Sequence, residues 1–149
     1  MPPAPAPCVL FDYSTYMVGA TARTLTTDVM PIFTTSCAIS LACHLSGSPN
    51  PPNLGGPADT PATVHAAIVG MTTTEVASMK YVVAGAPESS YLMRKVEDAV
   101  PGCNLTCTAP ASSPMACSGA IGRMPQGGPY LDPDKQSVIR DWIKQGAIQ

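Results

Sequence analysis

The sequence predicts a mainly α, loop-rich fold with a short N-terminal β-hairpin-like segment. Seventeen prolines and twelve glycines among 149 residues predict short elements joined by irregular chain. Several segments combine a capping residue with an early proline, which is the usual start of an α-helix. Residues 9–26 are rich in β-forming side chains around Gly19, which favours a hairpin or two short strands there.

The helix with the clearest signals is expected near the C-terminus. Asp132 can cap it, Pro133 suits its first position and Lys144 lies in its last turn. Gly146 is expected to end the helix. Its apolar stripe consists of Val138, Ile139, Trp142 and Ile143.

Three shorter helices are expected upstream, and long loops separate them. Residues 46–61 and 101–130 lack helical periodicity and are expected to be irregular, while residues 80–87 are expected to be extended. On the third helix, Tyr91, Leu92, Lys95 and Val96 share one face. The start signals of the three helices are Thr27 or Asp28 with Pro31, Thr60 with Pro61, and Pro87.

The chain is long enough for one domain with its own core. Residues 1–8 are expected to form a proline-rich N-terminal arm, and residues 9–149 a single domain. Within that domain, residues 9–26 form the β-rich lead-in. We expect no internal repeat and no second domain.

Composition excludes several classes of function. A net charge of −2 provides no basic surface for nucleic acid or anionic lipid. The apolar runs are shorter than a membrane span. Six cysteines favour an oxidising compartment. Residues 1–8 contain no hydrophobic signal segment, which by itself is typical of a cytosolic protein. Because of the cysteines we expect instead a periplasmic or extracellular protein whose signal has been removed.

The stretch that carries the most chemical information is Cys37-Ala-Ile-Ser-Leu-Ala-Cys43-His44. A Cys-His ending is typical of covalent haem sites, but these usually have two residues between the cysteines, and here there are five. On a regular helix the cysteines would be about 9 Å apart along the axis. A disulfide needs Cα atoms within roughly 7 Å, so any cross-link predicts a broken helix. Locally, haem attachment, a disulfide and two buried unlinked cysteines all remain open.

If His44 binds a haem iron, a second axial ligand is needed, and methionine is one that raises the reduction potential. Met124 is the leading candidate because it lies in the loop sequence GRMPQGGP just before the final helix. The glycines there allow the main chain to approach a flat ligand closely. Met115 and His65 are the other candidates, and gap filling in the core is the alternative role for Met124.

Three segments of the sequence resemble the small bacterial c-type cytochrome-like domains that carry a single haem. They are DVMPIFTTSCAISLACH, AGAPESSYLMRKV and RMPQGGPYLDPDKQSVIRDWIKQGA, which occur in the order typical of that family, and the family-like region covers roughly residues 27–148. The resemblance implies cytochrome c-like helices around one haem c. It also implies thioether bonds from Cys37 and Cys43, with His44 and Met124 as axial ligands. The five-residue spacing departs from the family pattern and affects Cys37 most.

The resemblance implies an electron carrier rather than an enzyme, with a redox protein as its partner and no nucleic acid or membrane span. The alternative is a haemless, disulfide-stapled module with a binding or structural role at the cell surface. If Cys37 and Cys43 hold the haem, four cysteines remain for two disulfides, and part of this set could instead bind zinc. They are Cys8, Cys103, Cys107 and Cys117.

Overall fold

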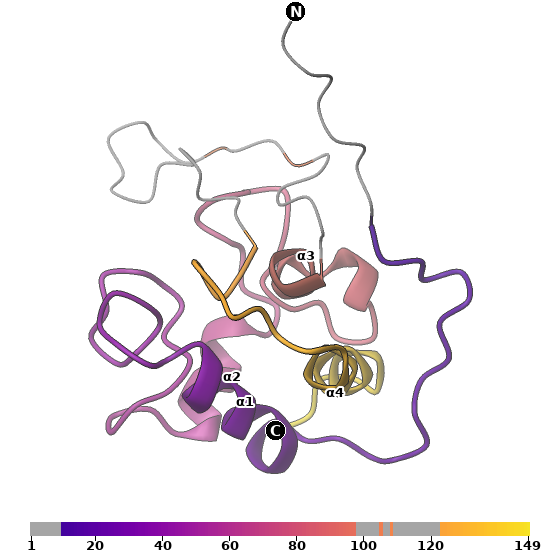
Figure 1. Cartoon of the computed structure of the whole chain (residues 1–149), viewed down its shortest axis with the longest axis horizontal. Helices are drawn as coiled ribbons and strands as arrows, with labels where there is room; N and C mark the ends of the chain where they lie inside the picture. The colour runs from indigo at the N-terminus through magenta and orange to yellow at the C-terminus, as the bar shows by residue number, and fades with distance from the viewer. Residues whose placement is uncertain (1–9, 98–104, 106–107, 109–122) are drawn as a thin grey trace, which may run out of the picture.

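The computed structural model describes residues 10–97, 105, 108 and 123–149. The described chain is mainly helical, as the sequence predicts, and long irregular segments join its helices (Figure 1). The expected proline-rich arm, residues 1–8, and most of the expected loop at 101–130 lie outside the described residues. In order, the elements are the π-helical turn η1 (Leu25–Val29), α1 (Met30–Ser36), α2 (Pro61–Ile68), the 3-10 turn η2 (Pro87–Ser89), α3 (Tyr91–Glu97) and α4 (Pro133–Lys144).

Helices α2 and α4 begin where the sequence predicts. The Asp132 side chain accepts a hydrogen bond from the Lys135 N–H at 2.9 Å and caps α4. Beyond α4, Gly146 has a φ of 108°, a backbone conformation that favours glycine. Thr60 and Thr63 form a reciprocal capping box at the start of α2. These starts are local, so neighbouring residues were sufficient to predict them.

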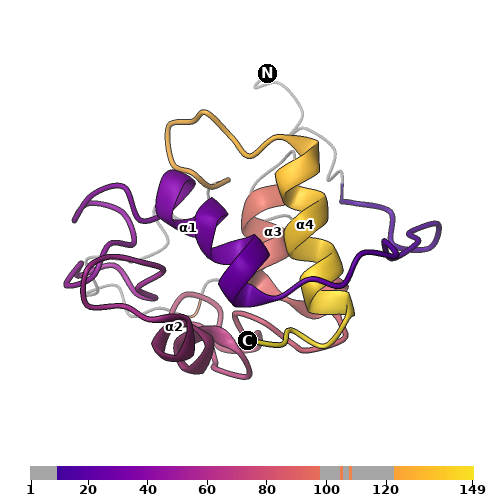
Figure 2. The ribbon, with the colours of Figure 1, turned by 90° about the horizontal axis from the view of Figure 1, so that it is seen from below.

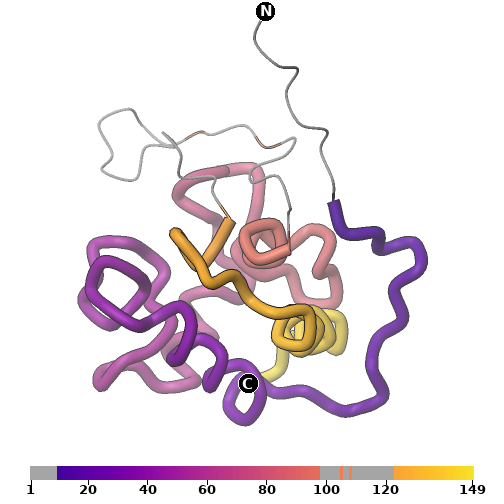
Figure 3. Tube along the Cα trace, viewed as in Figure 1, coloured from indigo at the N-terminus to yellow at the C-terminus, as the bar shows by residue number. Residues whose placement is uncertain are grey.

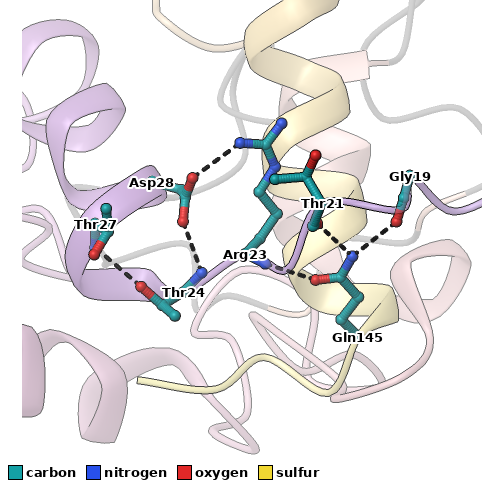
Figure 4. Close-up of polar contacts among 7 residues, drawn as sticks. All are labelled: Gly19, Thr21, Arg23, Thr24, Thr27, Asp28 and Gln145. Atoms are coloured by element: carbon teal, nitrogen blue, oxygen red, sulfur yellow. Dashed lines mark hydrogen bonds and ion pairs between the residues drawn. The ribbon is translucent and has the colours of Figure 1, made fainter.

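The first helix begins three residues earlier than predicted. Thr24, rather than Thr27 or Asp28, is its N-cap, and the Thr24 hydroxyl accepts a hydrogen bond from the Thr27 N–H (Figure 4). The Asp28 carboxylate bonds back to the Thr24 N–H at 2.9 Å and to Arg23 at 2.9 Å. Asp28 therefore serves as the acidic partner of the cap rather than as the cap itself.

The hairpin expected in residues 9–26 is not confirmed. Residues 10–24 form turns and irregular chain with no strand assigned among them, and we call this segment the strap. Its aromatic side chains pack against α4: the Arg140 guanidinium lies 3.7 Å from the ring centroid of Phe11. Tyr13 donates a hydrogen bond to Glu97 at 2.6 Å, and Tyr16 donates one to Asp141. The aromatic residues of the strap are thus partly buried against α3 and α4 instead of pairing as strands.

Gln145, just beyond α4, ties the strap to the end of that helix (Figure 4). Its side-chain oxygen accepts a hydrogen bond from the Arg23 N–H at 2.7 Å. Its side-chain nitrogen donates to the carbonyls of Gly19 at 3.1 Å and Thr21 at 2.9 Å. A Cβ on Gly19 would lie 2.4 Å from a carboxylate oxygen of Asp141, so a larger residue here would displace that carboxylate.

All four α-helices described contribute residues to the core, and α3 and α4 run side by side in both ribbon views (Figures 1 and 2). Chain beyond α4 turns back toward η1, where the Leu25 N–H donates to the Ile148 carbonyl at 3.0 Å (Figure 3). None of the helices described is both long and apolar enough to cross a membrane. Residues buried in the core include Phe33, Val64, Met93, Ile139, Trp142 and Ile143.

The first testable prediction concerns the Asp28 carboxylate. Hydrogen bonds from Thr24 and Arg23 lower the pKa of Asp28 below its ordinary value. Its stabilisation is therefore present above the unfolded pKa near 4 and is lost as pH falls through the lower folded pKa. We expect Asp28→Asn to reduce the free energy of unfolding by about 1 kcal/mol at neutral pH, measured by urea denaturation.

Once the pH lies below the lowered folded pKa, Asp28 is protonated in the native protein as well, so the same substitution should have little effect there. An equal loss of stability at neutral and acidic pH would contradict the role assigned to the carboxylate.

Candidate functional site

One pocket brings together all four residues that the sequence analysis selected. Cys37, Cys43 and His44 line it, as does Met124 from a distant part of the chain. The pocket encloses about 1150 Å³ of space not filled by protein, part of it open to solvent. Much of the wall between these residues is apolar and includes Leu54, Ile68, Leu92 and Val96.

The segment between the two cysteines is extruded from the helix. Helix α1 ends at Ser36, and the His44 N–H then donates to the Cys37 carbonyl at 3.0 Å. In an α-helix an N–H bonds to the carbonyl four residues back, whereas here the carbonyl is seven back, so three residues are surplus. The helix is broken at Cys37, as either cross-link requires, and His44 stays next to it.

The two thiols have different surroundings, and neither is in a disulfide. Cys37 is buried with 8% of its surface exposed, and it belongs to the hydrophobic core. Burial, assisted by the neighbouring Cys43, raises the pKa of Cys37 to about 12. Cys43 is half-buried, and its sulfur accepts a hydrogen bond from the Ser40 hydroxyl at 3.4 Å.

His44 is held at its backbone and at its ring. Its carbonyl accepts from the Leu54 N–H at 2.8 Å, and its Nδ1 lies 3.0 Å from the Pro52 carbonyl. A carbonyl can only accept, so Nδ1 carries the hydrogen and Nε2 carries the lone pair. Burial lowers the pKa of His44, although the carbonyls of Pro52 and Asn50 oppose that shift. A neutral imidazole with a defined tautomer is the form that binds a metal ion.

The loop after His44 holds the extruded segment in place by hydrogen bonds. The Ser48 hydroxyl donates to the Cys43 carbonyl at 2.6 Å, and the Asn50 side chain donates to the Ala42 carbonyl at 2.9 Å. Further along, Leu45 and Gly55 form an isolated parallel β-bridge. A Cβ on Gly55 would lie 2.9 Å from a methyl group of Thr34 on α1, so the loop packs tightly against that helix.

Met124 lies in the pocket because its segment donates hydrogen bonds to the last carbonyls of α3. The Met124 N–H donates to the Lys95 carbonyl at 2.6 Å, and the Arg123 Nε donates to the Val96 carbonyl at 3.4 Å. The last carbonyls of a helix have no partner within the helix, so a segment that supplies donors is anchored there. The position of α3 therefore determines the position of Met124.

A buried charged cluster in the pocket wall was missed by the sequence analysis. The Lys95 ammonium lies 3.5 Å from a carboxylate oxygen of Glu75, and the two side chains are only 10% and 9% exposed. The Tyr91 hydroxyl donates to the same carboxylate. Burial lowers the pKa of Lys95, partly offset by Glu75, and it raises the pKa of Tyr91. The shared face of Tyr91 and Lys95 was predictable, but their meeting with Glu75 was not.

His65, one of the alternative ligands, does not line this pocket. Its Nε2 lies 2.8 Å from the Ala147 carbonyl, so it packs against the C-terminal segment. Met115, the other alternative, lies outside the described residues, as do Cys8, Cys103, Cys107 and Cys117. Within the described ranges, no group of three or more His, Cys, Asp and Glu side chains is placed to hold a metal ion.

No protein-family model, curated protein or solved structure matches this chain. The pocket itself therefore carries the functional argument.

The extrusion predicts that the three surplus residues are dispensable for folding. Deleting Ile39, Ser40 and Leu41 leaves two residues between the cysteines and places the His44 N–H four residues after the Cys37 carbonyl, as in a helix. We expect this deletion to change the free energy of unfolding by less than about 1 kcal/mol in urea denaturation.

A matched deletion of residues 32–34 within α1 removes the buried core residues Ile32 and Phe33 and should abolish cooperative unfolding. If both deletions abolished it, the segment 39–41 would be an integral part of the fold.

The buried cluster makes a second prediction for this site. Glu75→Gln leaves the Lys95 ammonium buried without that carboxylate, and we expect a loss of about 3 kcal/mol of unfolding free energy at neutral pH. The control is Glu88→Gln, since Glu88 is exposed and its change should stay within about 0.5 kcal/mol. Equal effects of the two substitutions would mean that the buried pair does not support α3.

Proposed function

We propose that this protein is a single-haem c-type cytochrome that transfers electrons. In this proposal Cys37 and Cys43 bond the haem, and His44 and Met124 are its axial ligands. The observation that carries the proposal is that these four residues line one pocket although Met124 is far from the others in sequence. Nothing in local sequence spacing requires that meeting.

The chemistry of the pocket suits a haem. A flat macrocycle with apolar edges needs apolar walls, which Leu54, Ile68 and Val96 provide. The Nδ1 hydrogen bond to Pro52 orients the imidazole and leaves Nε2 as the metal-binding nitrogen. Two reduced thiols lie beside that histidine, as thioether formation requires.

Each residue then has a physical task. When bound, the haem supplies an iron that accepts and releases one electron. His44 holds its lone pair in a constant orientation, and Met124, anchored on α3, offers a thioether that favours the reduced metal. The apolar walls lower the exposure of the bound group to water. This arrangement supports an electron carrier rather than a catalyst.

We further propose a periplasmic or extracellular location and a redox protein as the partner. Six cysteines support a compartment in which disulfides persist.

The decisive experiment is to express the chain in a host that attaches c-type haems. Visible spectra, pyridine haemochrome analysis and intact mass should reveal one covalent haem. Cys43→Ala should reduce covalent loading, and His44→Ala should remove low-spin ligation. Met124→Ala should lower the reduction potential because it removes the thioether ligand. Met17→Ala is the control, since this strap residue is 86% exposed and should leave all three properties unchanged.

Folded protein that emerges from the same host without haem would overturn the proposal. Mass analysis showing only disulfides would then support the haemless, disulfide-stapled module instead.

A further inference from the structure

The exposed part of the pocket wall carries no charge among the residues described. Its exposed members are Ile39, Ala42, Pro51, Thr74 and Gln126. The charged side chains in the same wall, Glu75 and Lys95, are buried, opposite in sign and 3.5 Å apart. The rim of the pocket is therefore neutral and largely apolar.

The sequence explains this neutrality. No Asp, Glu, Lys or Arg occurs between Asp28 and Asp59, the stretch that includes the extruded loop and the segment supporting it. Residues 124–131, which bring Met124 to the pocket, also lack these residue types. Two separate uncharged segments thus meet at one opening.

The extruded loop adds apolar surface through Ile39, which lines the pocket, and through Leu41, which lies next to the lining residue Ala42 in sequence. Ile39 is 62% exposed and Leu41 is 58% exposed. The loop is held in place because the Ser40 carbonyl accepts hydrogen bonds from the Cys43 N–H at 3.0 Å and the Leu45 N–H at 3.4 Å. These backbone hydrogen bonds hold the Ile39 and Leu41 side chains in solvent, where their exposed apolar surface is unfavourable.

We propose that this rim, with Ile39 and Leu41 at its edge, is the docking surface for a redox partner that presents an uncharged, apolar face. The inference rests on the proposed function, because electron transfer requires close approach to the pocket. A charged surface on the partner would lose its hydration on binding here and would meet no opposite charge to compensate for that loss. An apolar face would instead gain about 25 cal/mol for each Å² of apolar surface buried. Association here proceeds without electrostatic steering, so it should depend little on ionic strength.

Gold surfaces coated with monolayers that end in methyl, carboxylate or ammonium groups provide defined probes of this surface. Adsorption is measured by a quartz crystal microbalance, and electron exchange by voltammetry on the same films. The native protein should prefer the methyl surface, with adsorption nearly constant between about 0.01 M and 1 M salt. Replacing Ile39 and Leu41 with serine should weaken adsorption about tenfold and slow electron exchange.

The matched control replaces Met17 and Val18 with serine, since these apolar residues of the strap are 86% and 45% exposed. The strap runs along the opposite side of the molecule from residues 37–56 in both ribbon views (Figures 1 and 2). The control should adsorb and exchange electrons like the native protein.

Preference for a charged monolayer, or equal losses in the two double variants, would overturn the inference. So would sedimentation showing a dimer that the Ile39 and Leu41 substitutions dissociate, because the surface would then bind a second copy. A protein without haem gives no current, which overturns the proposed function. Its adsorption still decides whether the rim binds an uncharged apolar surface, so the two failures are distinguishable.

Discussion

The burial of one face of α4 is the constraint on which the rest of this structure depends. Trp142 is completely buried, and its indole N–H donates to the Ile148 carbonyl at 2.7 Å, which draws the C-terminal segment back onto the core. Arg140 pairs with Glu97 at the end of α3 and also stacks on Phe11 of the strap. A single helix thereby orders the strap, α3 and the chain end in a protein with little other regular structure.

The pocket follows from how that core places two helix ends. The C-terminal end of α1 presents Cys37, and the C-terminal end of α3 accepts the segment that carries Met124. Helix ends leave backbone groups without helical partners, so each one recruits irregular chain. In a loop-rich protein, irregular segments that bind to helix ends can bring distant residues together around one cavity. In other folds a sheet would align such residues.

The buried charged pair in the pocket wall has a desolvation cost, and a cavity with a purely structural role would not need such a pair. Burying Glu75 and Lys95 removes hydration from both, and apolar replacements are often at least as stable as such a pair. The pair holds α3 against the segment before it, while its opposite charges leave the pocket close to neutral. Among the residues described, the wall and the exposed rim of the pocket are therefore both close to neutral.

The sequence by itself determined the local features. The caps of α2 and α4 and the glycine after α4 depend on residues within one or two helical turns, so they could be predicted. The start of the first helix was misplaced because Thr24 and Asp28 act as a pair across four residues. The strap was expected to form strands because it is rich in β-forming residues. Its aromatic rings pack against α4 instead of against a second strand.

Only the tertiary structure decided which distant residues share a site. The sequence selected Met124 and His44, but their common pocket depends on α3 lying against α4 and on the Met124 segment completing α3. Glu75 carried no signal because its partners lie on another helix, and His65 was set aside because it contacts Ala147. Such long-range contacts arise from packing the whole core, which no local pattern of residues encodes.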